Sequence, residues 1–479
     1  MLVLRSTKGG EIDVNQRKKL VIALVLITLV TAACGTRVNK AAFYKQLAQQ
    51  GAQTTTGAAT TGGTTTTGTS TGGTTTGGTT SGGTTTGGTT TGGTATGGTT
   101  TGGVSNNGAG GSAASLGVST APVGNTIKIG LNIPLTGAAP VPSSFQDSIT
   151  VAQDYLNSNG GINGRQVQFL VEDDGYDPAQ GLAACKKLAG ENILFAVGHT
   201  MPTIEEECTN FYGQQKIPYI MRGIPESTLS GHPLAYFGTP SDDFQSTLLA
   251  DYVVHRIANG KTLVNDIVTE NDQPVSKTNY SAEIKRLGGK FGNTYNSAPR
   301  QSDWSSIISH LKGDSAGIVF LNIAPVDAIS LAVQSKNQGY HPVWVGEGTH
   351  WNYNLSMQSA GSALDGAFVF SPWASIDSPA ANDYKAAYAK YKPGKTPDDL
   401  GLIIWGYANM IKQALIGAGK SLTRASFVDA MNKMSFSAAY WNPLSYTPTD
   451  HRGPRVVAVF RGDGNAQKWV QISGFAGSF

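Results

Sequence analysis

Histidine and cysteine are the residue types best suited to metal binding or nucleophilic chemistry, and this 479-residue chain has only 7 His and 3 Cys. The histidines lack the short spacings at which imidazoles share a metal ion. No H-E-x-x-H, G-x-x-x-x-G-K-[ST] or C-x-x-C motif occurs. We therefore predict a protein that is not an enzyme and that uses neither a metal nor a cofactor.

Cys34 ends a segment typical of export signals. Three basic residues, Arg17 to Lys19, precede the apolar run Leu20–Val30, and Thr31-Ala-Ala-Cys34 follows. A helix of this length spans about 16 Å, short of a ~30 Å hydrocarbon core. Residues 1–33 are therefore predicted to be a signal peptide. The small residues before Cys34 resemble a bacterial lipobox, which implies lipidation of Cys34, although Thr31 stands where an aliphatic residue is usual. An ordinary cleaved signal with an incidental cysteine is the alternative.

A low-complexity linker is predicted over residues 34–125. Thr and Gly make up all of Thr54–Gly103 apart from a few Ala and Ser residues, so the segment has no large apolar side chain to bury. As a coil, the linker has an end-to-end distance of ~50–60 Å, enough to hold a folded part off a surface. A wall-binding role for the repeat itself is the alternative. The net charge of +3 is too small to indicate a nucleic-acid partner.

The remaining residues, 126–479, alternate short apolar runs with amphipathic stretches. This rhythm predicts an α/β fold with two doubly wound, parallel-sheet lobes. Strands are expected at Ile127–Ile133, Gln166–Glu172, Ile193–Val197, Pro218–Met221, Leu263–Thr269, Ile318–Asn322 and Val343–Val345. Helices are expected at Ser144–Asn157, Asp177–Ala189, Thr203–Gln214, Thr247–Asn259, Pro274–Leu287, Trp304–Lys312 and Val326–Gln338.

Several motifs are more specific than this rhythm. GLNIPLTG at 130–137, NSNGGINGR at 157–165 and EDDGYDP at 172–178 follow one another, with SDWS at 302–305 further on. Asp177-Pro178 fits an N-cap with Pro at the first helical position, and the Gly-rich pairs fit turns. Together the motifs resemble the type I periplasmic binding proteins, in particular the leucine/isoleucine/valine-binding branch associated with ABC transporters.

That resemblance implies two lobes that close around a small solute and are joined by a hinge of three crossovers. Lobe one would be 126–244 with 373–440, and lobe two 245–372 with 441–479. The expected function is an exported, lipid-anchored solute-binding protein, acting as a monomer at the outer face of the cell membrane. It would deliver a branched-chain amino acid, or a related amide or carboxylate, to an ABC permease. The alternatives are a ligand sensor for a membrane signalling protein and an envelope attachment protein.

Candidate ligand contacts in lobe one lie where its strands end, the usual place for ligands in such sheets. Thr200 and Met201 are the favoured contacts, and Thr203 is a further one, although its spacing to Glu206 fits a capping box. In relatives, a Ser where Pro202 stands and a Thr where Pro225 stands belong to a clamp for the ligand's α-carboxylate and ammonium, so this clamp is damaged twice. Arg222, beside Gly223, could replace it by pairing with a carboxylate, or could form a structural salt bridge.

In lobe two, Glu347 aligns, if the alignment is shifted by one residue, with the family glutamate that binds the ligand's ammonium group. Asn322 follows a strand and can offer an amide. Trp351 and Trp373 lie where relatives place aromatic walls, although either can equally cover the core. Cys185 and Cys208 lie on successive lobe-one helices, which right-handed crossovers place side by side, so we predict a disulfide between them.

Overall fold

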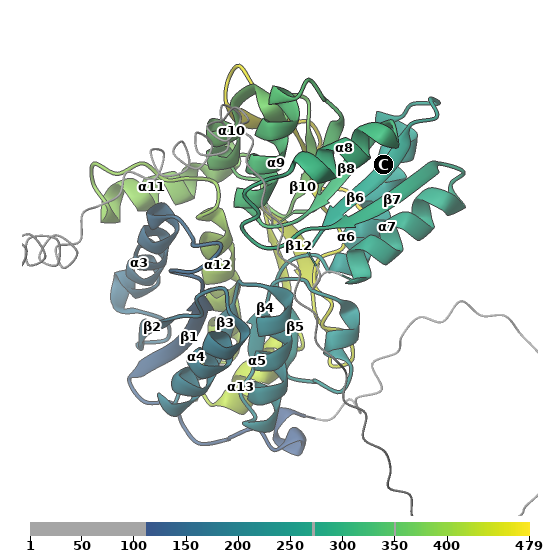
Figure 1. Ribbon diagram of the computed structural model, residues 1–479. Coiled ribbons are helices and arrows are strands. Elements are labelled where there is room, and N and C mark those ends of the chain that lie inside the picture. Colours follow the sequence, from purple (N-terminus) through teal and green to yellow (C-terminus); the bar gives the residue numbers. More distant parts are fainter. Residues whose placement is uncertain (1–111, 271–273, 349–350) are drawn as a thin grey trace, which may run out of the picture.

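The computed structural model describes residues 112–270, 274–348 and 351–479. The signal peptide, Cys34 and most of the predicted linker lie outside these ranges. The described chain forms two α/β lobes, one above the other in Figure 1, each with its own sheet. Among the described residues, no helix combines the length and apolar character needed to cross a membrane.

The first lobe is built on a five-stranded parallel sheet of order β2-β1-β3-β4-β5. Helices α3 and α12 pack together on one face of this sheet, and α4 and α5 pack together over the other. The strands are β1 Thr126–Ile133, β2 Gln166–Asp173, β3 Phe195–Gly198, β4 Tyr219–Met221 and β5 Ala235–Phe237. The helices are α3 Ser143–Asn157, α4 Pro178–Gly190, α5 Pro202–Gln214, α11 Asn382–Tyr391, α12 Leu402–Gly417 and α13 Arg424–Met431.

The second lobe has a seven-stranded sheet of order β14-β13-β10-β9-β8-β6-β7. The predicted parallel pairing holds from β7 to β10, whereas β13 and β14 add an antiparallel edge. Its strands are β6 Val264–Thr269, β7 Lys290–Asn296, β8 Ala316–Asn322, β9 Val343–Gly346, β10 Phe368–Ser371, β13 Ala458–Asp463 and β14 Lys468–Gln471. Its helices are α6 Asp242–Tyr252, α7 Pro274–Arg286, α8 Ser305–Gly313, α9 Pro325–Asn337 and α10 Asn354–Ala360.

The chain passes between the lobes at places that differ from those predicted. Helix α6 packs in the core of the second lobe and begins at Asp242, so the first passage precedes residue 244. The hairpin of β11 (Ser435–Ala438) and β12 (Trp441–Ser445) packs in the core of the first lobe. The chain enters the core of the second lobe only at Val457. The predicted return to lobe two at residue 441 is therefore wrong.

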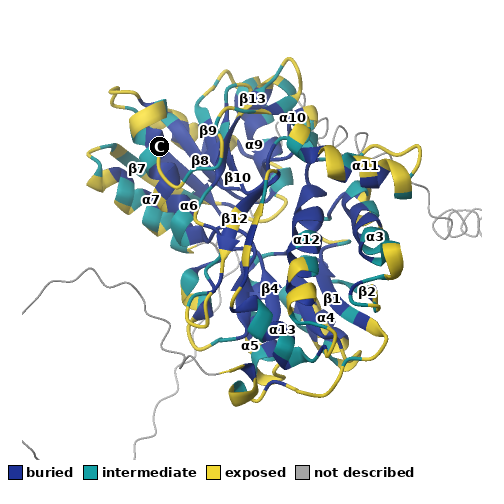
Figure 2. Cartoon of the chain, turned by 180° about the vertical axis from the view of Figure 1, so that it is seen from behind, coloured by how far each residue is buried: buried dark blue, intermediate teal, exposed yellow. Residues whose placement is uncertain are grey.

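The last part of the predicted linker belongs to the folded structure. A short 3-10 helix, Ala113–Leu116, packs on α13, and the backbone N–H of Ala113 donates to Oδ1 of Asp429 at 3.0 Å. The N–H of Ala425 donates to the carbonyl of Ser119 at 3.0 Å. The linker therefore ends before residue 112 and not at 125. The buried interiors of both lobes appear dark blue in Figure 2.

Helix starts show which local signals decided the structure. Asp177 caps α4 as predicted, accepting a hydrogen bond from the N–H of Gln180 at 3.0 Å, with Pro178 at the first helical position. Thr203 does not cap α5, because the N-cap is Met201 and Pro202 starts the helix. The predicted capping box is therefore wrong, since Pro fits the first helical position and places Thr203 inside the first turn.

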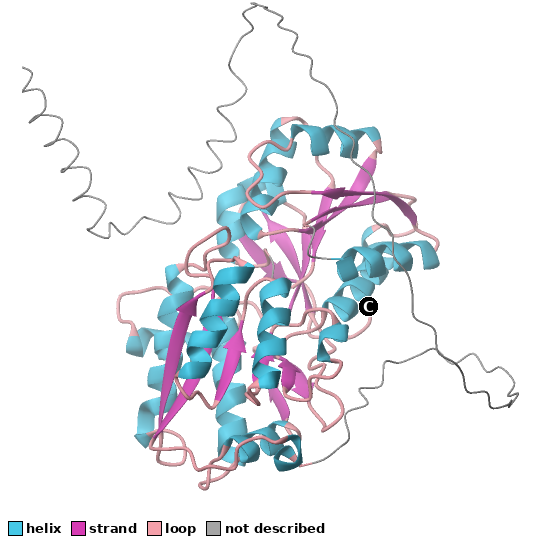
Figure 3. Ribbon diagram, turned by 60° about the horizontal axis from the view of Figure 1, so that its bottom comes forward, coloured by secondary structure: helices cyan, strands magenta, loops and turns pink. Residues whose placement is uncertain are grey.

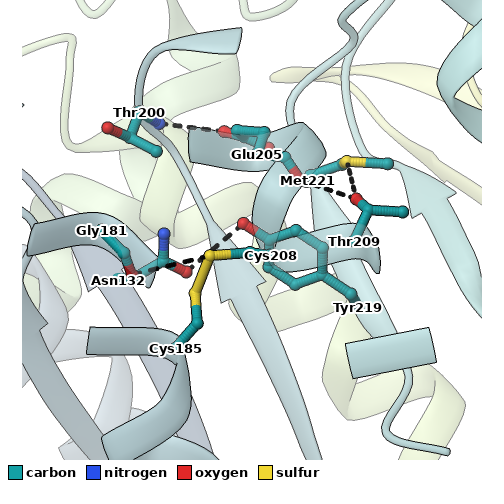
Figure 4. Close-up of a disulfide and its surroundings, with 9 residues drawn as sticks. All are labelled: Asn132, Gly181, Cys185, Thr200, Glu205, Cys208, Thr209, Tyr219 and Met221. Atoms are coloured by element: carbon teal, nitrogen blue, oxygen red, sulfur yellow. Dashed lines mark hydrogen bonds between the residues drawn. A yellow bond between two sulfur atoms is a disulfide. The ribbon is translucent and has the colours of Figure 1, made fainter. Parts of the chain in front are cut away.

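The predicted disulfide between Cys185 and Cys208 is present. It joins α4 to α5, and the two Cα atoms lie 5.9 Å apart (Figure 4). Both cysteines are fully buried in an apolar cluster with Leu188, Ile204 and Tyr212. The bridge therefore fixes the pair of helices that covers one face of the first sheet.

Candidate ligand-binding site

The parallel strands of both sheets end in the region between the lobes. In Figure 3 the strands of the first sheet run toward the second lobe. His199 and Arg222 directly follow β3 and β4, whereas Glu270 and Glu347 directly follow β6 and β9. Polar side chains from both lobes therefore meet between two apolar cores.

In the first lobe, the loop after β3 is closed by a buried carboxyl group. The backbone N–H of Thr200 donates to Oε1 of Glu205 at 2.9 Å (Figure 4). Glu205 is fully buried on α5, and this burial raises its pKa to about 8, although the charge of Arg222 opposes the shift. The N–H of Thr200, a residue expected to contact the ligand, is therefore already engaged within the protein.

Arg222 is buried beside this loop. Its Nε donates to the carbonyl of Thr200 at 2.7 Å, and its Nη1 lies 3.8 Å from Oδ1 of Asp242 at the start of α6. The N–H of Gly223 donates to Oγ1 of Thr239 at 2.8 Å. A Cβ at position 223 would lie 2.0 Å from the carbonyl oxygen of Pro240. Glycine is thus required here by close packing, and its N–H is engaged as well.

In the second lobe, Glu347 is fully buried at the end of β9. Its Oε2 accepts a hydrogen bond from the hydroxyl of Ser276 on α7 at 3.1 Å, whereas Oε1 has no hydrogen-bond partner among the described residues. Burial raises the pKa of Glu347 well above its ordinary value, and the nearby charge of Asp242 adds to this, while Arg222 opposes it. Glu205, Arg222, Asp242, Ser276 and Glu347 form what we call the inter-lobe cluster.

Asn322 lies next to this cluster. In the pairing of β8 with β9, Phe320 lies opposite Val345. Asn322 and Glu347 each follow two residues later, so this register puts them side by side on the same face of the sheet. Asn322 is fully buried, and within the described ranges neither its amide nitrogen nor its amide oxygen makes a hydrogen bond. A buried polar group without a partner is costly, which makes such a group suited to receiving a ligand.

The two tryptophans predicted as aromatic walls lie in the cores. Trp351 is fully buried in the second lobe, where its Nε1 donates to the carbonyl of Leu321 at 3.1 Å and its ring packs on Trp469. Trp373 is 1% exposed and packs on Trp441 at the hinge, with ring centroids 6.5 Å apart. Both rings thus pack in the cores, as the alternative interpretation expects, and a contact with ligand stays a prediction.

Met201 and Thr203 lie at the first turn of α5. Met201 is half-buried and packs against the apolar cluster that contains the disulfide. The hydroxyl oxygen of Thr203 is buried and, among the described residues, has no hydrogen-bond partner. A ligand role for these two residues stays a prediction.

Sequence reasoning missed three members of the inter-lobe cluster. Asp242 is an acidic residue in the first turn of a helix, a common stabilising position, so its type gives no sign of burial. Glu205 occupies a comparable place on α5, and Ser276 is an ordinary helical serine. Among the residues that the structure describes, no group of three or more His, Cys, Asp or Glu side chains is arranged to hold a metal ion.

Two α/β lobes with a buried polar cluster between them define a two-lobed binding protein. The family model described as periplasmic binding protein matches residues 126–467. The chain belongs to this family of solute-binding proteins.

Curated relatives and solved structures agree with this membership. The chain is 26% identical over 300 residues to Leu/Ile/Val-binding protein homolog 1 of Brucella abortus, covering 62% of this chain and 79% of the relative. It is 25% identical over 287 residues to a leucine-, isoleucine-, valine-, threonine- and alanine-binding protein of Pseudomonas aeruginosa, covering 58% and 74%.

Among solved structures, a fatty acid ABC transporter substrate-binding protein from Thermomonospora curvata has a TM-score of 0.67 at 22% identity, covering 76% of this chain and 95% of its own. A branched-chain amino acid ABC transporter protein from Thermus thermophilus, with bound valine, has a TM-score of 0.65 at 13% identity, covering 74% and 97%. At these identities the structural likeness shows the fold alone.

Proposed function

We propose that this protein is the solute receptor of an ABC importer, held at the outer face of the cell membrane by a lipid on Cys34. The curated relatives named above are a homologue of a Leu/Ile/Val-binding protein and an amino-acid-binding protein, and the predicted signal sequence with its Cys34 supports export and lipidation. The inter-lobe cluster is the observation that carries the proposal. Arg222 from the first lobe and Glu347 from the second lie near one another, so a solute held there contacts both lobes only when they are closed.

The hydrogen-bonding groups of the region support a ligand that donates. The N–H groups of Thr200 and Gly223 are engaged, Pro202 has none, and Arg222 already faces Asp242. In contrast, Oε1 of Glu347 and both amide atoms of Asn322 lack hydrogen-bond partners among the described residues, which leaves two acceptors against one donor group. We therefore propose a small ligand with an ammonium or amide N–H directed at Glu347, either a branched-chain amino acid or a related amide. A simple carboxylate fits this arrangement less well.

A thermal-shift screen of the full chain against amino acids, amides, amines and small carboxylates tests the proposal. A ligand at a hundredfold excess over its Kd stabilises by about 2.7 kcal/mol, which is readily measured. We expect stabilisation by an amine or amide, and its loss in Glu347→Gln. Glu191→Gln, a substitution of a half-exposed side chain at the end of α4, is the matched control and should keep it.

Two outcomes would contradict the proposal. If no compound of the panel stabilises the protein, the solute-binding role for these classes fails. If a compound stabilises wild type and Glu347→Gln equally, the role of the inter-lobe cluster fails.

A further inference from the structure

A second contact between the lobes lies away from the inter-lobe cluster and involves an exposed arginine. Arg300 follows β7 in the second lobe, and its Nε donates to the carbonyl of Ala138 in the first lobe at 3.1 Å. Its Nη2 donates to the neighbouring carbonyl of Gly137. One edge of the guanidinium thus engages two successive carbonyls, a fork that only arginine provides.

The second lobe holds Arg300 in position for this contact. Its φ of 58° lies in the left-handed region, which is uncommon for a residue with a side chain. Its backbone N–H donates at 2.9 Å to Oδ2 of Asp327, a buried residue in the first turn of α9. An unusual backbone conformation that the surroundings enforce is a reason to look for a role of that residue.

The first lobe holds the receiving carbonyls equally firmly. Asp173, at the end of β2, accepts hydrogen bonds from the N–H groups of Leu135 at 2.9 Å, Thr136 at 3.1 Å and Gly175 at 2.9 Å, and from the Thr136 hydroxyl at 2.6 Å. Burial alone raises the pKa of Asp173, but these donors bring it below its ordinary value. Gly137 has a φ of 83°, and a Cβ there would lie 1.6 Å from the carbonyl oxygen of Gly175. The motifs at 130–137 and 172–178 therefore build one rigid loop.

We propose that Arg300 and the carbonyls of Gly137 and Ala138 form a clasp that holds the lobes closed and thereby sets solute affinity without touching the solute. The clasp engages only when the lobes approach, so it favours the closed state. It shares this task with the contact between the N–H of Asn354 and Asp399, 2.8 Å apart, so losing the clasp weakens closure without abolishing it. The effect on closure stands independently, and only the effect on affinity rests on the proposed solute binding.

The test measures the separation of the lobes directly. Spin labels at Asn210→Cys on α5 and Asn337→Cys on α9, in the full chain with Cys34→Ser, report the inter-lobe distance by pulsed electron paramagnetic resonance. Arg300→Ala should shift the distribution toward longer separations and, for a solute found in the screen, raise Kd about three- to tenfold, mainly through faster release. Arg286→Ala is the matched control, since Arg286 is an exposed arginine that pairs with Glu283 within its own helix, and it should change neither quantity.

A second variant tests the first-lobe loop that carries the carbonyls of Gly137 and Ala138. Asp173→Asn should loosen this loop and shift the inter-lobe distances in the same direction as Arg300→Ala. The double variant should show little further shift, because both substitutions weaken the same contact. A distance distribution of Arg300→Ala identical to that of wild type would overturn the clasp. This result can be read even if no solute in the screen binds, so failure of the clasp and failure of the proposed function remain distinguishable.

Discussion

The backbone N–H of Thr200 donates to Oε1 of Glu205 at 2.9 Å, so the loop that ends β3 is closed by a side chain of the helix that follows it. Glu205 is fully buried beside Arg222. The carboxyl group of Glu205 thus accepts the hydrogen bond that the N–H of Thr200 could otherwise give to a ligand. This contact engages the N–H of Thr200 within the first lobe.

Glu205 should make stability depend on pH. Its pKa in the folded protein is raised to about 8, so between pH 4.5 and 8 the native state keeps a proton that the unfolded chain has released. The free energy of unfolding should therefore fall as pH rises through this window, by at most about 1.4 kcal/mol per pH unit. Glu205→Gln retains the acceptor for Thr200 but cannot ionise, so urea unfolding from pH 5 to 8 should show a shallower decline. Equal slopes for the two proteins would contradict this assignment.

Glu347 should release a proton when an amine binds. Burial, with the charge of Asp242, raises the pKa of Glu347 well above its ordinary value, whereas a bound ammonium favours the ionised form. Binding at a pH below that raised pKa should therefore release up to about one proton, and affinity should increase with pH over the same range. Calorimetry in phosphate and in Tris, whose ionisation enthalpies differ, measures the proton count. We expect no release in Glu347→Gln, and proton uptake by wild type would refute the linkage.

The disulfide should stabilise the first lobe. Cys185 and Cys208 are 23 residues apart, and closing a loop of this size contributes about 3 kcal/mol. The double variant Cys185→Ala/Cys208→Ala should lose about that much free energy of unfolding in a denaturant titration. Thiol titration of the denatured, unreduced protein provides the control. Two free sulfhydryls from these positions would show that the bond does not form.

Trp351 should matter for stability and not for binding. It is fully buried between Gly346 and Trp469, so Trp351→Ala should cost about 3–5 kcal/mol of unfolding free energy through the cavity it leaves. Trp351→Phe preserves much of the packing and serves for binding measurements. Its solute affinity should equal that of wild type. A large loss of affinity in a well-folded Trp351→Phe protein would restore the aromatic-wall interpretation.

Local signals in the sequence predicted most of the elements that carry the site. The strand predicted at Ile127–Ile133 is β1, and the helix predicted at Pro274–Leu287 is α7 with a one-residue difference at its end. Asp177-Pro178 predicted the start of α4 because capping and the fixed φ of Pro act within a few residues. Strand β7, whose residues are mostly exposed or half-buried, lacks an apolar run and was missed for that reason.

The sequence by itself determined the two-lobed α/β class and the pairing of Cys185 with Cys208, because hydrophobic period, turn residues and crossover handedness are properties of short segments. Only the tertiary structure decided that Asp242 and Glu205 are buried around Arg222, that Trp351 lies in a core, and that Arg300 reaches Gly137. Burial and contact across 163 residues depend on how whole layers pack. No local pattern distinguishes a carboxylate that faces water from one enclosed between two lobes.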